Sequence, residues 1–257
     1  RIPYLNSVPF YEYFEKRRFR ILPVTPRRMG VLAKRGQIDA GLFSLVDFLE
    51  QRDSLEPLGY GIVTRDQVKS VLLFSRGGWR DLEGKTIGIT DDTATSVHLL
   101  RVILEKKYGV RARFVRMHTG VNKYREYDAV LLIGDEALKY SRTGLDGFEM
   151  IYDLAREWYE WQKLPFVFAV WAIRKGMDPE VKAELAGQIQ RALEQGEVDL
   201  ERIGTAHARA VGLSPEQAVE YLAGFKYRIG EREMEAIELF HGLLKEMEAP
   251  AKQGTNG

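Results

Sequence analysis

Short strand-like runs, each followed at once by residues that start a helix, recur along this chain and constrain its fold most strongly. Residues 38–42 are followed by Ser44, and residues 128–133 by Gly134 and Asp135. Serine and aspartate are favoured at helix N-caps because their side chains accept hydrogen bonds from the first free backbone N–H groups. Strands that alternate with helices build sheets covered by helices, so the sequence predicts an α/β fold.

The alternating elements form two consecutive series. In the first series we expect strands at residues 2–5 and 38–42, a helix from the cap residues Asn6 and Ser7 to residue 14, a helix from Thr25-Pro26 to Gly36, and a helix at residues 45–50 capped by Ser44. In the second series we expect strands at residues 70–75, 85–89, 113–116 and 128–133, a helix capped by residues 93–96 and ended by Gly109, and a short helix from Gly134.

An apolar and aromatic run at residues 166–173 predicts a central strand. From Asp178-Pro179 onward the sequence predicts only helices, with a capping-box spacing from Ser214 to Gln217 and a disordered tail at residues 251–257. We therefore expect two lobes, residues 1–68 plus 166–257 and residues 69–165, each with a mixed sheet flanked by helices, and a helical C-terminal segment. Ligands of such sheets bind near helix N-termini beyond the strand ends, so the ligand cleft is expected between the lobes.

Composition excludes several classes of protein. The 38 Lys and Arg residues nearly balance the 37 Asp and Glu residues, which gives no reason to expect nucleic acid or a membrane surface as a partner. The chain has no cysteine, so disulfides and cysteine nucleophiles are excluded. No apolar run approaches the roughly 20 residues that span a bilayer. The first residues do not show the signal-peptide pattern of a charged segment followed by an apolar one, which favours a cytoplasmic protein. The oligomeric state is not predicted.

Motifs of several enzyme classes are missing from the sequence. It contains no G-x-S-x-G, no Walker sequence and no G-x-G-x-x-G, so hydrolase, triphosphatase and dinucleotide chemistry are poorly supported. The histidines lack zinc-ligand spacing, and a surface or core role is expected for each: His98, His118, His207 and His241. We therefore expect no metal.

Polar residues at the predicted strand-to-helix turns are the candidate site residues. They are Asn6, Ser7, Ser44, Thr93, Thr95, Ser96 and Asp135. Hydroxyl groups beside helix N-termini suit a carboxylate ligand, but ordinary capping is the commoner role of such residues. Asp135 could also be a general acid or base. Trp158, Trp161 and Trp171 are expected in the core, although one could line an aromatic-sized pocket. The residues alone thus predict a cleft for a small acidic molecule and leave its chemistry open.

Five stretches resemble the chorismate dehydratases of the futalosine route to menaquinone. They are residues 2–9 (IPYLNSVP), 35–42 (RGQIDAGL), 68–75 (VKSVLLFS), 131–135 (LLIGD) and 164–171 (LPFVFAVW). The last is the most specific, because the related dihydroxynaphthoate synthases carry a glycine-containing sequence after Leu-Pro. The resemblance implies a periplasmic-binding-protein type II fold in a cytoplasmic lyase. It also implies that the enzyme needs no cofactor and removes water from chorismate to give 3-[(1-carboxyvinyl)oxy]benzoate.

With chorismate as the substrate, roles follow as hypotheses. The expected catalytic residues are Asn6 and Ser70, and the expected substrate-binding residues are Ser7, Ser44, Thr95, Ser96, Asp135 and Pro165. We expect Asn6 and Ser70 to hydrogen-bond the reacting region, while Thr95 and Ser96 hold a carboxylate. Because no side chain stands out as the base, the enolpyruvyl carboxylate of the substrate is the expected acceptor of the ring proton.

Two stretches depart from the family pattern. Arg65-Asp66-Gln67 stands where many members have Gly-Pro, and Gln162-Lys163 where many have Thr-Gly, so ligand contacts from these positions are not carried over. Three other functions stay open: a non-catalytic receptor for a small organic acid, the sister dihydroxynaphthoate synthase, and a transcription-regulator effector domain. The last is disfavoured because the sequence has no helix-turn-helix segment and no basic patch.

Overall fold

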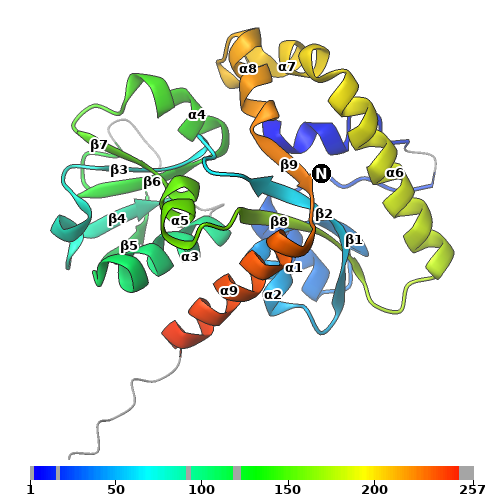
Figure 1. Cartoon of the computed structure of the whole chain (residues 1–257), viewed down its shortest axis with the longest axis horizontal. Helices are drawn as coiled ribbons and strands as arrows, with labels where there is room; N and C mark the ends of the chain where they lie inside the picture. The colour runs from blue at the N-terminus through cyan, green and yellow to red at the C-terminus, as the bar shows by residue number, and fades with distance from the viewer. Residues whose placement is uncertain (1–2, 16–17, 91–93, 118–122, 249–257) are drawn as a thin grey trace, which may run out of the picture.

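The computed structural model describes residues 3–15, 18–90, 94–117 and 123–248 and shows two sheets side by side, each flanked by helices (Figure 1). The described helices are η1 (Leu5–Phe10), α1 (Pro26–Lys34), α2 (Leu45–Glu50), η2 (Trp79–Leu82), α3 (Thr95–Val102), η3 (Ile103–Tyr108), α4 (Gly134–Thr143), α5 (Leu154–Gln162), α6 (Pro179–Val198), α7 (Leu200–Ala208), η4 (Arg209–Val211), α8 (Pro215–Ala223) and α9 (Glu231–Glu248). The described strands are β1 (Ala40–Ser44), β2 (Leu55–Thr64), β3 (Val71–Ser75), β4 (Thr86–Ile89), β5 (Arg113–Arg116), β6 (Ala129–Ile133), β7 (Met150–Asp153), β8 (Phe166–Arg174) and β9 (Phe225–Arg228). The predicted two-lobed α/β class is confirmed.

The first sheet has the strand order β1-β8-β2-β9, with β8 inside it as predicted for the apolar run at residues 166–173. Its described strands pair only antiparallel, whereas a mixed sheet was expected. The prediction of an all-helical C-terminal segment is wrong at β9. There the sequence Phe-Lys-Tyr-Arg alternates buried and exposed side chains, which is the period of a strand and is too short to stand out among helices.

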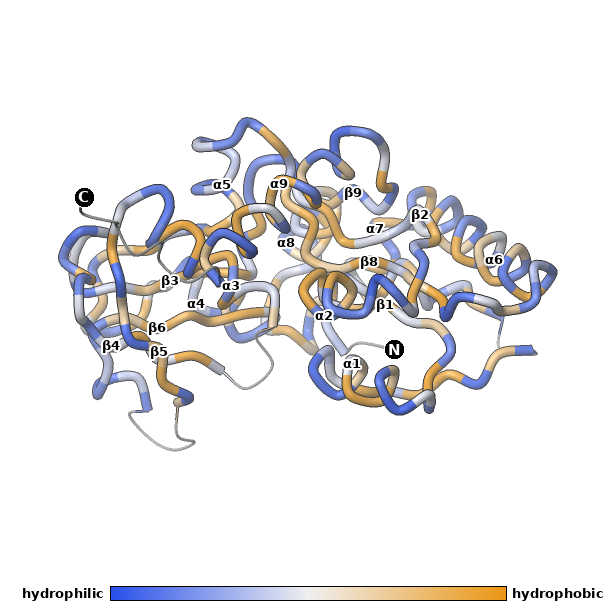
Figure 2. Tube along the Cα trace, turned by 90° about the horizontal axis from the view of Figure 1, so that it is seen from below, coloured by the Kyte–Doolittle hydropathy of each residue, from blue (hydrophilic) through white to orange (hydrophobic). Residues whose placement is uncertain are grey.

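The second sheet has the order β5-β4-β6-β3-β7 and is mixed, because β4 runs parallel to β5 and β6 while β3 pairs antiparallel. Every residue of β3 is buried, so both faces of this strand are covered. Alternate side chains enter different cores: Leu73 joins the large core shared with the first sheet, whereas Leu72 and Phe74 join a smaller one. Figure 2 shows the resulting hydrophobic stretches along the strands of both sheets.

The N-terminal prediction is wrong. Residues 3–5 form no strand, and the 3-10 helix η1 begins at Leu5 with Tyr4 as its N-cap, so Asn6 and Ser7 lie inside the turn and do not cap it. The Ser7 hydroxyl donates to the Tyr4 carbonyl at 2.8 Å, and Pro9 cannot donate a backbone hydrogen bond to a longer helix. Residue 2, Thr93, His118 and residues 251–257 lie outside the described residues.

Most other local predictions are confirmed. Thr25 precedes α1 with Pro26 in the first turn, Gly36 follows it with φ of 66°, and Ser44 caps α2. The capping box from Ser214 to Gln217 is present at α8. Strands β2 and β7 and helix α5 were not predicted from the sequence. Strand β2 contains Pro and Gly and shifts register along β8, which hides the regular alternation of a strand.

Two chain segments join the sheets, and both contain a non-glycine residue in the left-handed region: Lys69 with φ of 57° and Lys163 with φ of 58°. Glycine adopts this conformation without strain, whereas a lysine disfavours it. An edge-to-face cluster of Trp158, Phe166 and Phe240 packs beside the second segment. Helix α9 contacts both β8 and α3, so the C-terminal helix packs against both halves of the molecule (Figure 1).

Candidate active site between the two sheets

A small cavity of about 80 Å³ lies where elements of the two sheets meet. Its polar lining brings together five predicted site residues: Asn6, Ser44, Ser70, Thr95 and Ser96. The rest of the lining is apolar or aromatic and includes Tyr4, Ile62, Phe168 and Gly134. None of the described lining residues is charged, so a ligand here meets neutral hydrogen-bonding groups.

Asn6 enters the cavity from η1. Its Oδ1 atom is buried and has no hydrogen-bond partner within the described structure. A buried acceptor without a partner costs about 1–3 kcal/mol, so a ligand that donates a hydrogen bond to this oxygen would recover that energy.

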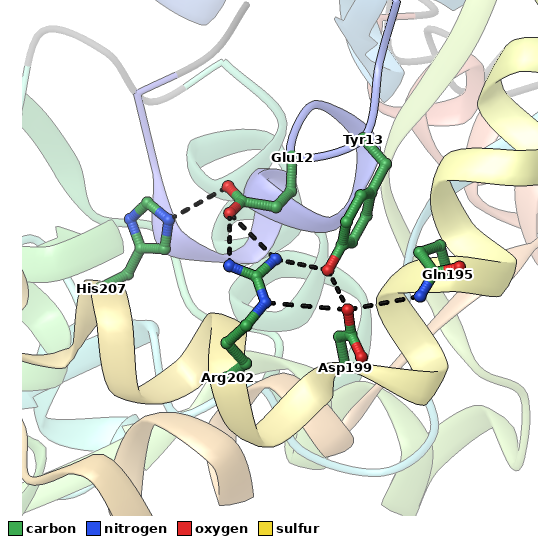
Figure 3. A network of polar contacts seen from close by, with 6 residues as sticks. All are labelled: Glu12, Tyr13, Gln195, Asp199, Arg202 and His207. Atoms are coloured by element: carbon green, nitrogen blue, oxygen red, sulfur yellow. Dashed lines mark hydrogen bonds and ion pairs between the residues drawn. The ribbon is translucent and has the colours of Figure 1, made fainter.

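A polar network beyond η1 holds the turn that carries Asn6 (Figure 3). Glu12 accepts from Arg202 at 3.3 Å and lies 3.4 Å from Nε2 of His207. Tyr13 hydrogen-bonds both Asp199 and Arg202, and its hydroxyl lowers the pKa of Asp199. The network therefore ties the N-terminal turn to α7 and the residue before it.

Ser70 lies on the first connecting segment and is almost fully buried, with 1% of its surface exposed. Its carbonyl accepts from the Gly134 N–H at 2.8 Å, and its hydroxyl receives a hydrogen bond from Tyr221 at 2.8 Å. Gly134 has φ of 60°, and a Cβ atom there would lie 2.8 Å from the ring of Tyr4. This position therefore requires glycine for two reasons, its conformation and its close contact with the cavity wall.

Ser44 both caps α2 and lines the cavity. Its hydroxyl accepts from the Asp47 N–H at 3.1 Å and contacts the Asp47 carboxylate at 2.7 Å. Burial raises the pKa of that carboxyl group, while the Ser44 hydroxyl opposes the shift. The capping interpretation and the site interpretation are thus compatible at this residue.

Thr95 does not cap its own helix. The N-cap of α3 is Ala94, which lies within the predicted cap at residues 93–96 but makes no side-chain capping bond. Thr93 lies outside the described residues. The Thr95 hydroxyl instead accepts from the backbone N–H of Val46 at 3.2 Å. This bond satisfies a free N–H in the first turn of α2, so it connects a helix beside the first sheet to a helix beside the second.

Three predicted site residues do not line the cavity. Ser7 is fully buried in its own turn, and the Pro165 carbonyl accepts from the Trp158 indole at 3.2 Å. Asp135 lies one residue beyond Gly134 and has a buried Oδ1 atom without a partner in the described structure. Burial raises the pKa of Asp135, and the Leu5 N–H opposes the shift, so this carboxyl group touches the turn of Asn6.

Sequence reasoning missed Tyr221, Tyr4 and Phe168. Tyr221 lies in the helical C-terminal segment, 151 residues from Ser70, and no local pattern predicts their contact. The tryptophans Trp158 and Trp171 are buried in the core as expected, and none of the tryptophans lines this cavity. A larger cavity of about 400 Å³ lies between residues 18–22 and β1; Trp171 lines it, but none of the expected catalytic or substrate-binding residues does.

Metal binding has no support in the described part of the chain, where no group of three His, Asp or Glu side chains could hold an ion. His98 bonds the Ala94 carbonyl and His241 contacts Glu238, as expected for structural histidines. None of the described helices is both long enough and apolar enough to cross a bilayer.

Solved structures share this architecture. A protein of Archaeoglobus fulgidus matches with a TM-score of 0.75 at 19% identity and covers 96% of each chain. A Candida albicans protein described as having the generic periplasmic binding protein fold matches with a TM-score of 0.60 at 13% identity, over 98% of this chain and 89% of that one. The predicted periplasmic-binding-protein fold is therefore confirmed.

Sequence relatives are more specific. A chorismate dehydratase of Thermus thermophilus is 32% identical over 251 residues, which cover 92% of this chain and 91% of that protein. The profile of the family described as menaquinone biosynthesis matches residues 1–246. A match over nearly the whole chain leaves no large part outside the family, and the resemblance of the five stretches agrees with it. This chain belongs to the menaquinone biosynthesis family.

Proposed function

We propose that this protein is a chorismate dehydratase, a lyase that converts chorismate into 3-[(1-carboxyvinyl)oxy]benzoate and water, and that it acts in the cytoplasm. The observation that carries this proposal is the meeting of Asn6 and Ser70, from two distant segments, at one cavity with three further hydroxyl residues. The Thermus relative supports the choice of substrate.

The reaction suits a neutral site. Chorismate loses a proton from ring carbon 3 and the hydroxyl from carbon 4, and the ring becomes aromatic. Because the product is so much more stable, the protein has mainly to hold the reacting groups in place, exclude water and stabilise developing charge. The absence of charged residues from the described cavity lining fits a reaction that is driven by aromatisation of the substrate and in which the protein mainly positions the reacting groups.

Each lining group has a role in the proposal. Asn6 and Ser70 hydrogen-bond the reacting region, where the unpartnered Oδ1 of Asn6 can accept from the carbon 4 hydroxyl. Thr95 and Ser96 lie in the first turn of α3, whose free N–H groups and partial positive charge favour a substrate carboxylate. The enolpyruvyl carboxylate of chorismate takes the carbon 3 proton as the bond from carbon 4 to its hydroxyl breaks, and it passes this proton to the departing hydroxide, which leaves as water.

We also propose that residues 1–68 with 166–257 and residues 69–165 are lobes that open and close about hinges near Ser70 and Pro165. The strands of each sheet fall on one side of this division, and the left-handed residues Lys69 and Lys163 lie at the two connections. The cavity of about 80 Å³ is smaller than the roughly 300–1,000 Å³ typical of organic ligand sites. Chorismate therefore enters when the lobes separate, and the lobes then close around it to a cavity larger than about 80 Å³.

The direct test is incubation of the purified protein with chorismate, followed by absorbance and mass of the product. Formation of 3-[(1-carboxyvinyl)oxy]benzoate without added cofactor is the expected result. Binding without conversion would instead identify a solute receptor of the same fold. A protein that neither binds nor converts chorismate would refute both functions.

Two variants test the site. Asn6→Ala and Ser70→Ala are each expected to lower kcat about 100-fold, the usual effect of removing a preorganised hydrogen-bonding group. Ser141→Ala is the matched control, since Ser141 bonds the Leu138 carbonyl on α4 and does not line the cavity. Near-normal turnover in both site variants would refute these roles.

A further inference from the structure

Tyr221 of α8 is a buried phenol that reaches the proposed catalytic serine. Its side chain is 4% exposed, Ser70 is 1% exposed, and their hydroxyl oxygens are 2.8 Å apart. Helix α8 also contacts η1, the turn that carries Asn6, and it lies beside the junction of the two sheets (Figure 1). One side chain of the C-terminal segment thus stands next to both proposed catalytic residues.

The chemistry of the two hydroxyls sets the direction of the hydrogen bond. Burial raises the pKa of Tyr221, and the side chains of Ser70 and Asn6 only partly oppose this shift, so the phenol keeps its proton. A phenol is a stronger donor and a weaker acceptor than an aliphatic hydroxyl. Tyr221 therefore donates to the Ser70 oxygen, which leaves the serine proton to point away from Tyr221.

Ser70 lines the cavity, so a ligand is the available acceptor for that proton. We propose that Tyr221 is a positioning residue that holds the Ser70 hydroxyl as a hydrogen-bond donor toward the substrate. This inference rests on the proposed dehydratase function and deepens it. Because a hydroxyl that accepts one hydrogen bond becomes a better donor of the next, Tyr221 also strengthens the bond from Ser70 to the ligand.

The test compares Tyr221→Phe with Tyr227→Phe. Both tyrosines are buried and flank Phe225, with ring centroids 5.0 Å and 6.2 Å from it. The Tyr227 hydroxyl is buried without a partner in the described structure, so its removal breaks no known bond. Tyr221→Phe is expected to lower kcat about tenfold, as for loss of one buried hydrogen bond, with KM changed less than about twofold. Tyr227→Phe is expected to keep the wild-type kcat.

A double-mutant cycle separates positioning from packing. In the Ser70→Ala background, Tyr221→Phe is expected to cause no further loss of kcat, because the residue acts through Ser70. Tyr221→3-fluorotyrosine, which keeps both ring and hydroxyl, is expected to retain wild-type kcat and covers the case in which Tyr221→Phe fails to fold. Equal tenfold losses with and without Ser70, or a tenfold loss in the fluorotyrosine protein, overturn the inference.

Wild-type turnover is measured in the same assay. Wild-type conversion of chorismate with unchanged kcat in Tyr221→Phe overturns this inference alone. A wild-type protein that leaves chorismate intact overturns the proposed function, and this inference with it.

Discussion

Substitution of Asp153 should loosen the connection between the two sheets. Its Oδ2 atom accepts from the backbone N–H groups of Val68 and Lys69 at 2.9 and 2.7 Å. Its Oδ1 atom accepts from those of Ala155 and Arg156 at 3.0 and 3.2 Å and so caps α5. The carboxylate therefore joins the segment before Ser70 to the start of the helix that leads into the second connection.

Asp153→Asn keeps the size of the side chain but leaves one acceptor oxygen for two pairs of donors. Whichever way the amide turns, its NH2 group faces two backbone N–H groups that lose their acceptor. At about 1–1.5 kcal/mol for each lost bond, in a partly buried setting, the free energy of unfolding should fall by about 2–3 kcal/mol. Lys69 also has a left-handed backbone conformation, which is unfavourable for a residue other than glycine. This segment therefore depends further on its hydrogen bonds to Asp153.

Urea unfolding at neutral pH measures the effect. Asp146→Asn is the control, because the Asp146 side chain is 87% exposed and, among the described residues, pairs only with Arg125 on the surface, where such a pair contributes about 0–1 kcal/mol. A free energy of unfolding for Asp153→Asn within about 0.5 kcal/mol of the wild type would show that the four-bond anchor does not hold this connection.

Two further predictions concern Thr95 in the cavity wall and Asp47, which contacts the wall residue Ser44. Thr95→Val removes the acceptor for the Val46 N–H, so the free energy of lobe closure should become less favourable by about 1–2 kcal/mol. The KM for chorismate in the turnover assay should then rise about 5–30-fold, while Thr143→Val on the exposed end of α4 leaves the KM unchanged. Burial raises the pKa of Asp47 above 3.8, so the folded protein binds this proton more tightly than the unfolded chain and loses stability as the pH rises through the two pKa values. Urea unfolding should therefore show Asp47→Asn gaining stability relative to the wild type between pH 3.8 and pH 7, and a constant difference would contradict the assignment.

Tertiary packing determined which groups several of the predicted capping side chains contact. The amide of Asn6 and the hydroxyl of Thr95 were expected at helix N-caps, yet neither side chain caps its own helix. Thr95 bonds a different helix 49 residues away, because the packing of α2 against α3 brings the Val46 N–H to it. A short strand such as β9 likewise forms only because the edge of β2 is available to pair with it.

The sequence by itself determined the features that depend on neighbouring residues. The cap at Ser44, the proline start of α1 after Thr25, the capping box at Ser214 and the buried strand at residues 166–173 were all readable, since backbone N–H groups and apolar side chains act within a few residues. Only the tertiary structure decided that Ser70 meets Tyr221 and that Ser7, Asp135 and Pro165 stay outside the cavity lining. Contacts between residues far apart in the chain depend on how whole elements pack, and that information is spread over the complete core.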